Sequence, residues 1–157
     1  MVFQTYAEVE FMMAEAITRG WASGDAKAHY EAGVKAAMQM LSMLYPNAAA
    51  VSDAEVATYL AAKPFDTSKS LEMIGEQYWA ATFFNEYEAF ANWRRTGFPV
   101  LQPFGGEAIY DGNVTNGTIP RRLIYPGGEA STNADSFAAA IARQGANEFT
   151  TRVWWDK

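Results

Sequence analysis

The chain has 157 residues, of which 50% are hydrophobic and 19% are charged, and its formal net charge is −6. This composition predicts one folded domain with a hydrophobic core and disfavours an intrinsically disordered chain. The negative charge disfavours binding to nucleic acid or to anionic lipid, because both need a basic protein surface. The sequence has no cysteine, which excludes disulfides, thiol nucleophiles and cysteine-ligated zinc.

The sequence contains no apolar run of about 18 residues, so it predicts no transmembrane helix. Its first ten residues, MVFQTYAEVE, have neither the basic region nor the apolar region of a signal peptide. A helical pattern already begins near residue 6. We therefore expect the chain to be a fragment of a longer protein.

Residues 5–97 have the periodicity of successive α-helices. The first helix begins near residue 6 and ends before the turn RGWASGD, and a second helix ends before YPN. The spacing of these two helices and their small residues resemble a tetratricopeptide repeat. The apolar positions predict one face on each helix: Tyr6, Val9, Met13, Ala16 and Ile17 on the first, and Tyr30, Val34, Ala37, Met38 and Leu41 on the second.

The later helices have clearer boundaries. Ser52 and Glu55 have the spacing of a capping box at the start of a short helix, and Pro64 ends this helix. A longer helix begins at about Ser70, with Leu71, Ile74, Tyr78 and Ala81 on its buried face. We expect a break at Asn85 and a last helix over residues 86–95, with Gly97 as the residue after its C-cap.

Residues 98–157 are rich in Gly, Pro and Asn, and they predict a long irregular segment packed on the helices. One short helix is expected at SFAAAIARQG, closed by Gly145. Short extended pieces are expected at RRLIY and RVWW. The predicted fold class is therefore mainly α: tetratricopeptide-like helical hairpins (residues 1–97) packed with a loop-rich C-terminal segment (residues 98–157).

The sequence gives little support to an enzyme. His29 is the only histidine, so no histidine-based metal site or catalytic dyad is expected, and we interpret it as a surface or packing residue. Acidic pairs such as Glu86 and Glu88 lie on different helix faces and do not make the carboxylate pair of a glycosidase. No calcium loop or phosphate-binding loop is present, and no cofactor is expected.

Aromatic residues make up 15% of the chain, and their rings can either fill a core or stack on a sugar. We assign those at helical spacing to the core: Tyr78, Trp79, Phe83, Phe84, Phe90 and Trp93. Trp21 and Tyr110 lie instead in predicted turns. Both are candidate ligand contacts. Tyr110, with Asn113 and Asn116 nearby, is preferred for contact with a ligand or transporter, and Trp21 is favoured as a surface or partner residue.

Two arginine pairs are candidate structural anchors. Arg94 and Arg95 lie in the last turn of a helix, where positive charge meets the negative end of the helix dipole. We expect them to fasten the irregular segment that follows. Arg121 and Arg122 are expected to anchor their loop to carbonyls or carboxylates of the helical part.

Three motifs, in the order YEAFANWRRTGFPVLQP, TIPRRLIYP and TRVWWDK, resemble the C-terminal part of the SusD/RagB family of nutrient-binding outer-membrane lipoproteins of Bacteroidetes-type bacteria. YAEVEFMMAEAITRGW also resembles a tetratricopeptide-type helix of that family. The resemblance covers essentially the whole chain, but only about the last third of a typical member. It implies that residues 1–157 are the C-terminal part of such a domain.

The resemblance further implies a non-enzymatic protein at the surface of the outer membrane. Such proteins take part in polysaccharide utilization: they capture an oligosaccharide, or in some members a peptide, and deliver it to a TonB-dependent transporter of the SusC type. The full-length protein would meet the membrane only through its lipid anchor. The alternative is a tetratricopeptide-like scaffold that binds only protein.

Overall fold

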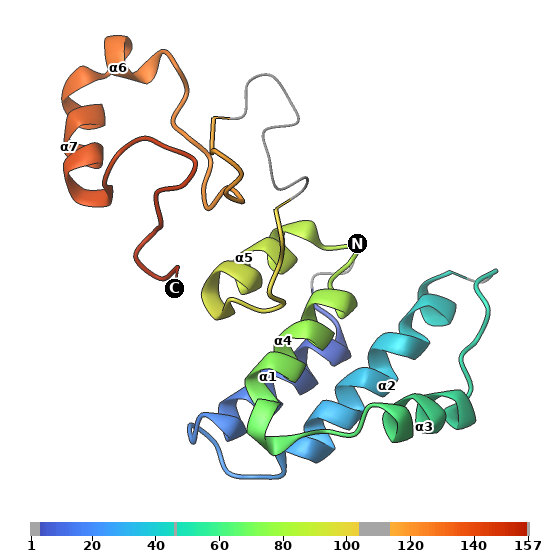
Figure 1. The fold of residues 1–157 in the computed structure, drawn as a ribbon. Helices are drawn as coiled ribbons and strands as arrows, with labels where there is room; N and C mark the ends of the chain where they lie inside the picture. Colours follow the sequence, from blue (N-terminus) through green and yellow to red (C-terminus); the bar gives the residue numbers. More distant parts are fainter. Residues whose placement is uncertain (1–3, 46, 104–113, 157) are drawn as a thin grey trace. The chain divides into compact units, whose positions relative to one another are not determined.

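The computed structural model describes residues 4–45, 47–103 and 114–156. The chain divides into two compact units, residues 1–99 and residues 100–157. Every regular element in the described residues is a helix, which confirms the mainly α fold class (Figure 1).

The first two helices form a hairpin, and a side-chain cap fixes the start of each helix. Helix α1 spans Tyr6–Thr18, and Thr5 caps it: the Thr5 hydroxyl accepts from the Glu8 N–H at 3.2 Å, while the Glu8 carboxylate accepts from the Thr5 N–H at 2.6 Å. Helix α2 spans Ala26–Leu44, and the Asp25 carboxylate accepts from two N–H groups of its first turn.

Helix α3 spans Asp53–Ala62 and begins at the predicted capping box. The Ser52 hydroxyl accepts from the Glu55 N–H at 3.3 Å, and the Glu55 carboxylate accepts from the Ser52 N–H at 2.8 Å. Val56 is buried behind this cap. The helix ends before Pro64, as predicted.

The 3-10 helix η1 (Thr67–Lys69) leads into α4 (Ser70–Ala81), and α5 (Glu86–Thr96) follows a turn at the predicted break. Gly97 ends α5 in the left-handed conformation, at φ 79°, with its N–H donating to the Trp93 carbonyl at 2.8 Å. The chain then packs Phe98 onto α4. A Cβ on Gly75 would lie only 2.5 Å from the Phe98 Cβ, so this approach requires glycine.

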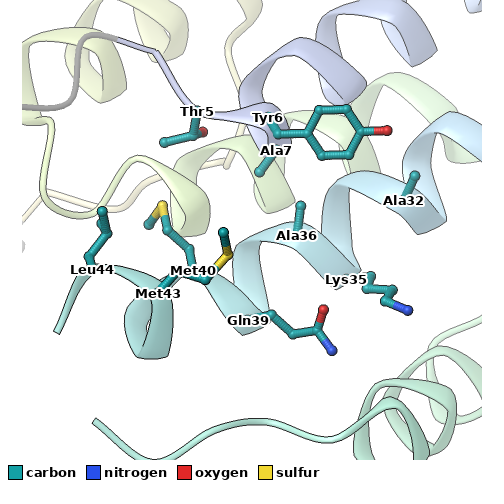
Figure 2. A pocket seen from close by; sticks show the side chains of 10 residues that line it. All are labelled: Thr5, Tyr6, Ala7, Ala32, Lys35, Ala36, Gln39, Met40, Met43 and Leu44. Atoms are coloured by element: carbon teal, nitrogen blue, oxygen red, sulfur yellow. The ribbon is translucent and has the colours of Figure 1, made fainter. Parts of the chain in front are cut away.

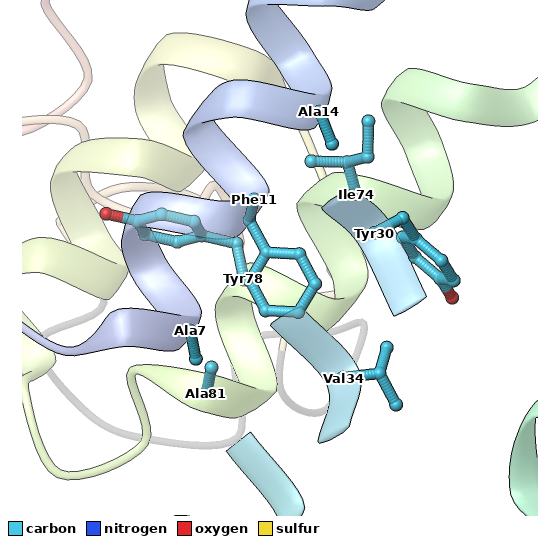
Figure 3. Packing of buried hydrophobic residues seen from close by; sticks show 8 residues of the cluster. All are labelled: Ala7, Phe11, Ala14, Tyr30, Val34, Ile74, Tyr78 and Ala81. Carbon is cyan, nitrogen blue, oxygen red and sulfur yellow. The ribbon is translucent and has the colours of Figure 1, made fainter. Parts of the chain in front are cut away.

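Phe11 lies at the centre of the core, where α1 packs against α2 and α4 (Figure 3). Its side chain is fully buried, and its ring centroid lies 6.1 Å from that of Tyr30 and 6.4 Å from that of Tyr78. Gly33 of α2 leaves room for this ring, since a Cβ there would lie 2.7 Å from the Phe11 Cε1. The other members of the cluster are Ala7, Ala14, Val34, Ile74 and Ala81.

The predicted apolar face of α1 was wrong. Tyr6, Val9 and Met13 are exposed, and the helix instead buries Ala7, Phe11 and Ala14 together with three glutamates. Nearly every side of α1 carries an apolar residue, so periodicity alone does not select the face. The faces predicted for α2 and α4 are largely confirmed, because Tyr30, Val34, Ile74, Tyr78 and Ala81 are buried.

Phe83 and Phe84 were also assigned wrongly to the core. Both are exposed, because α4 ends at Ala81 and the two rings lie in the turn that follows. The two rings contact each other, with centroids 5.2 Å apart. Tyr78 and Trp93 are buried, as predicted.

The second unit contains α6 (Glu129–Thr132) and α7 (Ala134–Gln144), which is the predicted short helix closed by Gly145. The Tyr125 and Phe137 rings meet edge to face, with centroids 5.9 Å apart. The described residues contain no strand at RRLIY or RVWW. The N–H groups of Arg121 and Arg122 both point to the Phe149 carbonyl, whereas a sheet ladder uses alternate carbonyls.

None of the helices in the described part of the chain combines the length and the hydropathy that crossing a bilayer requires.

Candidate functional site

A groove with mainly apolar walls lies between the start of α1 and the second half of α2 (Figure 2). Its volume is about 580 Å³, and Met43, at its edge, is 83% exposed. The lining residues are Thr5, Tyr6, Ala7, Ala32, Lys35, Ala36, Gln39, Met40, Met43 and Leu44. Such a surface suits apolar protein side chains better than the hydroxyl groups of a sugar.

The polar groups at the rim of this groove are already engaged. The Lys35 ammonium lies 2.9 Å from the Asp53 carboxylate, and the Gln39 amide donates to the same carboxylate at 2.8 Å.

A second hollow shares Thr5, Met40 and Leu44 with the groove and extends it to Phe84, after α4. The second hollow is more polar than the groove, because Glu8, Thr82 and Asn85 also line it.

A hollow of different character lies in the second unit, with a volume of about 520 Å³. It is lined by the end of α7 and by the turn near the C-terminus: Arg143, Gln144, Arg152, Val153, Trp154 and Trp155. Trp154 is 95% exposed. The hollow thus combines aromatic surface with cationic side chains.

The Glu15 carboxylate connects α1 to α5. Arg95 of α5 donates to both oxygens at 2.6 Å, and Arg19 donates to one of them at 2.7 Å. Burial alone would raise the pKa of Glu15, but the hydrogen bonds from Arg95 and Arg19 outweigh it and hold the pKa below 4.5. Arg95 also donates to the Asn92 side chain at 2.7 Å, so the ion pair is fixed at both ends.

We expect Glu15→Gln to lower the unfolding free energy by roughly 1.5–3 kcal/mol at pH 7, because it removes charge-assisted hydrogen bonds. A lowered folded-state pKa stabilises the fold above the unfolded value of 4.5, and this stabilisation is lost as the pH falls below it. The difference between wild type and variant should therefore shrink between pH 5 and about pH 3.

Urea unfolding of both proteins across this pH range measures that difference. Glu76→Gln is the control, since Glu76 is an exposed residue of α4. A difference that stays constant from pH 7 to about pH 3 would show that the ionised carboxylate of Glu15 is not the stabilising group.

Glu10 and His29 join α1 to α2. The His29 Nδ1 lies 2.6 Å from the Glu10 Oε2. Hydrogen bonds from Tyr6 and His29 lower the pKa of Glu10 below 4.5 against the opposing effect of burial. His29 therefore lies in a helix–helix contact, in keeping with a packing role.

The candidate ligand residues fall in different parts of the chain. Tyr110 and Asn113 lie outside the described residues. Asn116 is exposed at the tip of a turn, with φ 49°, next to Gly117 with φ 78°, and the Thr118 N–H donates to the Thr115 carbonyl across it at 3.1 Å. Trp21 is 73% exposed, and the Arg19 guanidinium lies 5.3 Å from its ring centroid. Their contact with a ligand stays a prediction.

The arginine pairs use different partners. Arg95 bonds to Glu15 of α1 rather than to the segment after α5, and the Arg94 guanidinium lies 4.1 Å from the Phe90 ring centroid. Arg121 forms an ion pair with Asp156, donating from Nε at 2.8 Å. Arg122 donates to the Leu123 carbonyl at 3.0 Å and lies over the Tyr125 ring. The role of these four arginines as structural anchors stays a prediction.

Sequence reasoning missed Glu15, Asp156 and Trp154 as residues of interest. Glu15 looks like any surface glutamate of a helix, and its partner Arg95 lies 80 residues further on. Asp156 and Trp154 both belong to the motif TRVWWDK, but the motif does not indicate which of its side chains is buried and which is exposed. The two adjacent arginines of TIPRRLIYP could have pointed to Asp156, because a buried arginine needs an acidic side chain as its partner.

A family model described as "Starch-binding associating with outer membrane" matches residues 1–126. This is most of the chain, so the chain belongs to this SusD-like family, which confirms the resemblance to SusD/RagB proteins. No curated protein sequence matches the chain.

Three solved structures illustrate the likeness. A chitin-binding protein is 39% identical with a TM-score of 0.86, and a Bacteroidetes SusD-like protein is 37% identical with a TM-score of 0.86. A chitin-binding SusD homologue from Flavobacterium johnsoniae is 27% identical with a TM-score of 0.72. The alignments cover 97%, 99% and 96% of this chain but only 32%, 30% and 36% of those proteins. The chain thus spans about a third of their length.

Proposed function

We propose that the chain is the C-terminal part of a non-catalytic, surface-exposed lipoprotein that binds a nutrient glycan and delivers it to a TonB-dependent transporter of the SusC type. The observation that carries this proposal is the match of residues 1–126 to a family described as starch-binding and associated with the outer membrane. The names of two similar structures, both chitin-binding, point to the same class of ligand.

The arrangement of the described residues is consistent with binding rather than catalysis. Each of the three glutamates that α1 buries serves a structural partner: Glu8 caps the helix, Glu10 contacts His29, and Glu15 holds two arginines. The apolar groove of the first unit and the hollow near Trp154 offer surfaces of different chemistry. The apolar groove suits a protein partner, and the hollow near Trp154 suits a polar ligand.

A tetratricopeptide-like scaffold that binds only protein is the second candidate. The apolar groove between α1 and α2 is the observation in its favour, because exposed apolar surfaces of this kind mark protein contacts. Such a scaffold would bind a protein partner and no sugar.

Calorimetric titration of the full chain with chito-oligosaccharides and malto-oligosaccharides tests the two functions. We expect saturable binding to at least one series, together with recovery of a TonB-dependent transporter when the protein is isolated from its membrane. Recovery of the transporter without binding to any sugar on a broad glycan array would favour the scaffold. Hydrolysis of an oligosaccharide would contradict both.

A further inference from the structure

We propose that the hollow at the end of α7 binds an acidic oligosaccharide, with Trp154 stacking on a sugar ring and Arg143 pairing with a carboxylate. The inference rests on the proposed function and names the site and the ligand class. It follows from three features of the second unit: a turn that displays an indole, a buried ion pair that fixes this turn, and the charge of the lining residues.

The turn at residues 153–156 displays Trp154. The Asp156 N–H donates to the Val153 carbonyl at 3.0 Å, which places Trp154 and Trp155 at the two central positions of a β-turn. Trp154 is nearly fully exposed, whereas Trp155 is half-buried. A flat apolar ring in this position offers a face for the C–H groups of a pyranose.

Asp156 holds this turn in place. Its side chain is fully buried, accepts from the Arg121 Nε at 2.8 Å, and accepts from the Arg152 Nη1 at 3.0 Å. The same segment approaches the end of α7, because a Cβ on Gly145 would lie 3.3 Å from the Thr151 side chain. The hollow is therefore built before any ligand arrives, which lowers the entropic cost of binding.

The lining of the hollow is cationic. Among the described residues, its lining includes Arg143 and Arg152 but no acidic side chain. Arg152 is engaged with Asp156, whereas Arg143 is exposed on the last turn of α7. This local positive charge contrasts with the net charge of −6 of the whole chain. Guanidinium groups bind carboxylates through paired N–H···O bonds, so a sugar that carries a carboxylate fits this lining better than a neutral one.

Gln144 adds a neutral polar group beside the arginines. Its amide can both donate to and accept from sugar hydroxyls. A small inorganic anion would use the guanidinium groups alone and leave the indole uncovered. The combination of ring, guanidinium and amide therefore points to a uronic-acid-containing chain.

Calorimetric titration of the full chain with tetragalacturonate tests the proposal, and the fully methyl-esterified tetramer is the neutral probe of the same shape. We expect Trp154→Ala to weaken binding of the acid about ten-fold or more, through lost stacking. We expect Arg143→Gln to weaken binding of the acid about ten-fold and to leave binding of the ester unchanged. Leu123→Ala and Lys63→Gln, two exposed positions outside the hollow, are the controls and should bind as wild type does.

The possible outcomes separate the site from the function. Equal affinity for acid and ester, or unchanged affinity in both variants, would overturn the proposed site. Wild type that binds neutral oligosaccharides but not tetragalacturonate would overturn it too, while leaving the proposed function intact. Variants that lose a co-purifying transporter but keep their sugar affinity would make the hollow a protein contact. Absence of binding to any sugar would overturn the site and the proposed function together.

Discussion

Replacing Asp156 with Ala is expected to destabilise the second unit by about 3–5 kcal/mol. The carboxylate is fully buried and accepts hydrogen bonds from Arg121 and Arg152. Its removal leaves the Arg121 guanidinium, itself buried, without its acid. Breaking one side of a buried ion pair costs more than the pair contributes, because the remaining charge stays out of water.

Amide hydrogen exchange of the full chain measures this effect locally. The N–H of Arg121, which donates to the Phe149 carbonyl at 2.7 Å, should lose protection in the variant, whereas α1 and α2 should keep theirs. Glu148→Ala, at an exposed position in the same unit, is the control. A double replacement of Arg121 by Met and Asp156 by Leu should cost less than Asp156→Ala. If Asp156→Ala exchanges as wild type does, the ion pair does not hold this unit together.

Phe11→Ala is expected to lower the unfolding free energy of the helical unit by about 3–5 kcal/mol. The Phe11 ring is fully buried. The Tyr30 ring packs against it edge to face, and the Tyr78 ring packs against it in a tilted arrangement. The space behind it is defined by Gly33, whose missing side chain makes room for the ring. Because the surrounding helices are linked by further contacts, they can close only part of the resulting cavity.

Urea unfolding followed by far-ultraviolet circular dichroism measures this loss. Phe83→Ala removes the same side chain from an exposed position and should change the midpoint little. Phe11→Leu should fall between the two. Equal midpoints for Phe11→Ala and Phe83→Ala would show that Phe11 is not the centre of the core.

Helix boundaries could be predicted from the sequence because they depend on residues close in the chain. The capping box of Ser52 and Glu55 and the left-handed Gly97 are local signals, and both are present in the structure. Thr5 and Glu8 have the same spacing and form a second capping box, at the start of α1.

The buried face of α1 could not be predicted in the same way. Its glutamates are buried because Glu10 meets His29 and Glu15 meets Arg95, and neither partner is visible from the helix itself. Hydrophobic periodicity treats such residues as solvent-facing and so selects Tyr6 and Val9 instead.

The hollow at the end of α7 could not be predicted either, because its residues come from separate segments of the chain. Trp154 and Arg143 are eleven residues apart in the sequence, and only the turn at residues 153–156 and the end of α7 bring them to one hollow. The Gly-rich insert makes Tyr110 the preferred candidate from the sequence, and Tyr110 lies outside the described residues. A loop composition predicts exposure, but it does not predict which exposed rings share a surface.

The contact between Glu15 and Arg95 also bears on the order of folding. It joins residues 80 positions apart, whereas the α1–α2 hairpin is built from contacts between neighbours in the chain. Contacts that close long loops cost more chain entropy and tend to form after local ones. We therefore expect the hairpin to form early, with Glu15 still hydrated, and α5 to dock last. Desolvation of this glutamate would then coincide with the arrival of the guanidinium that stabilises its charge.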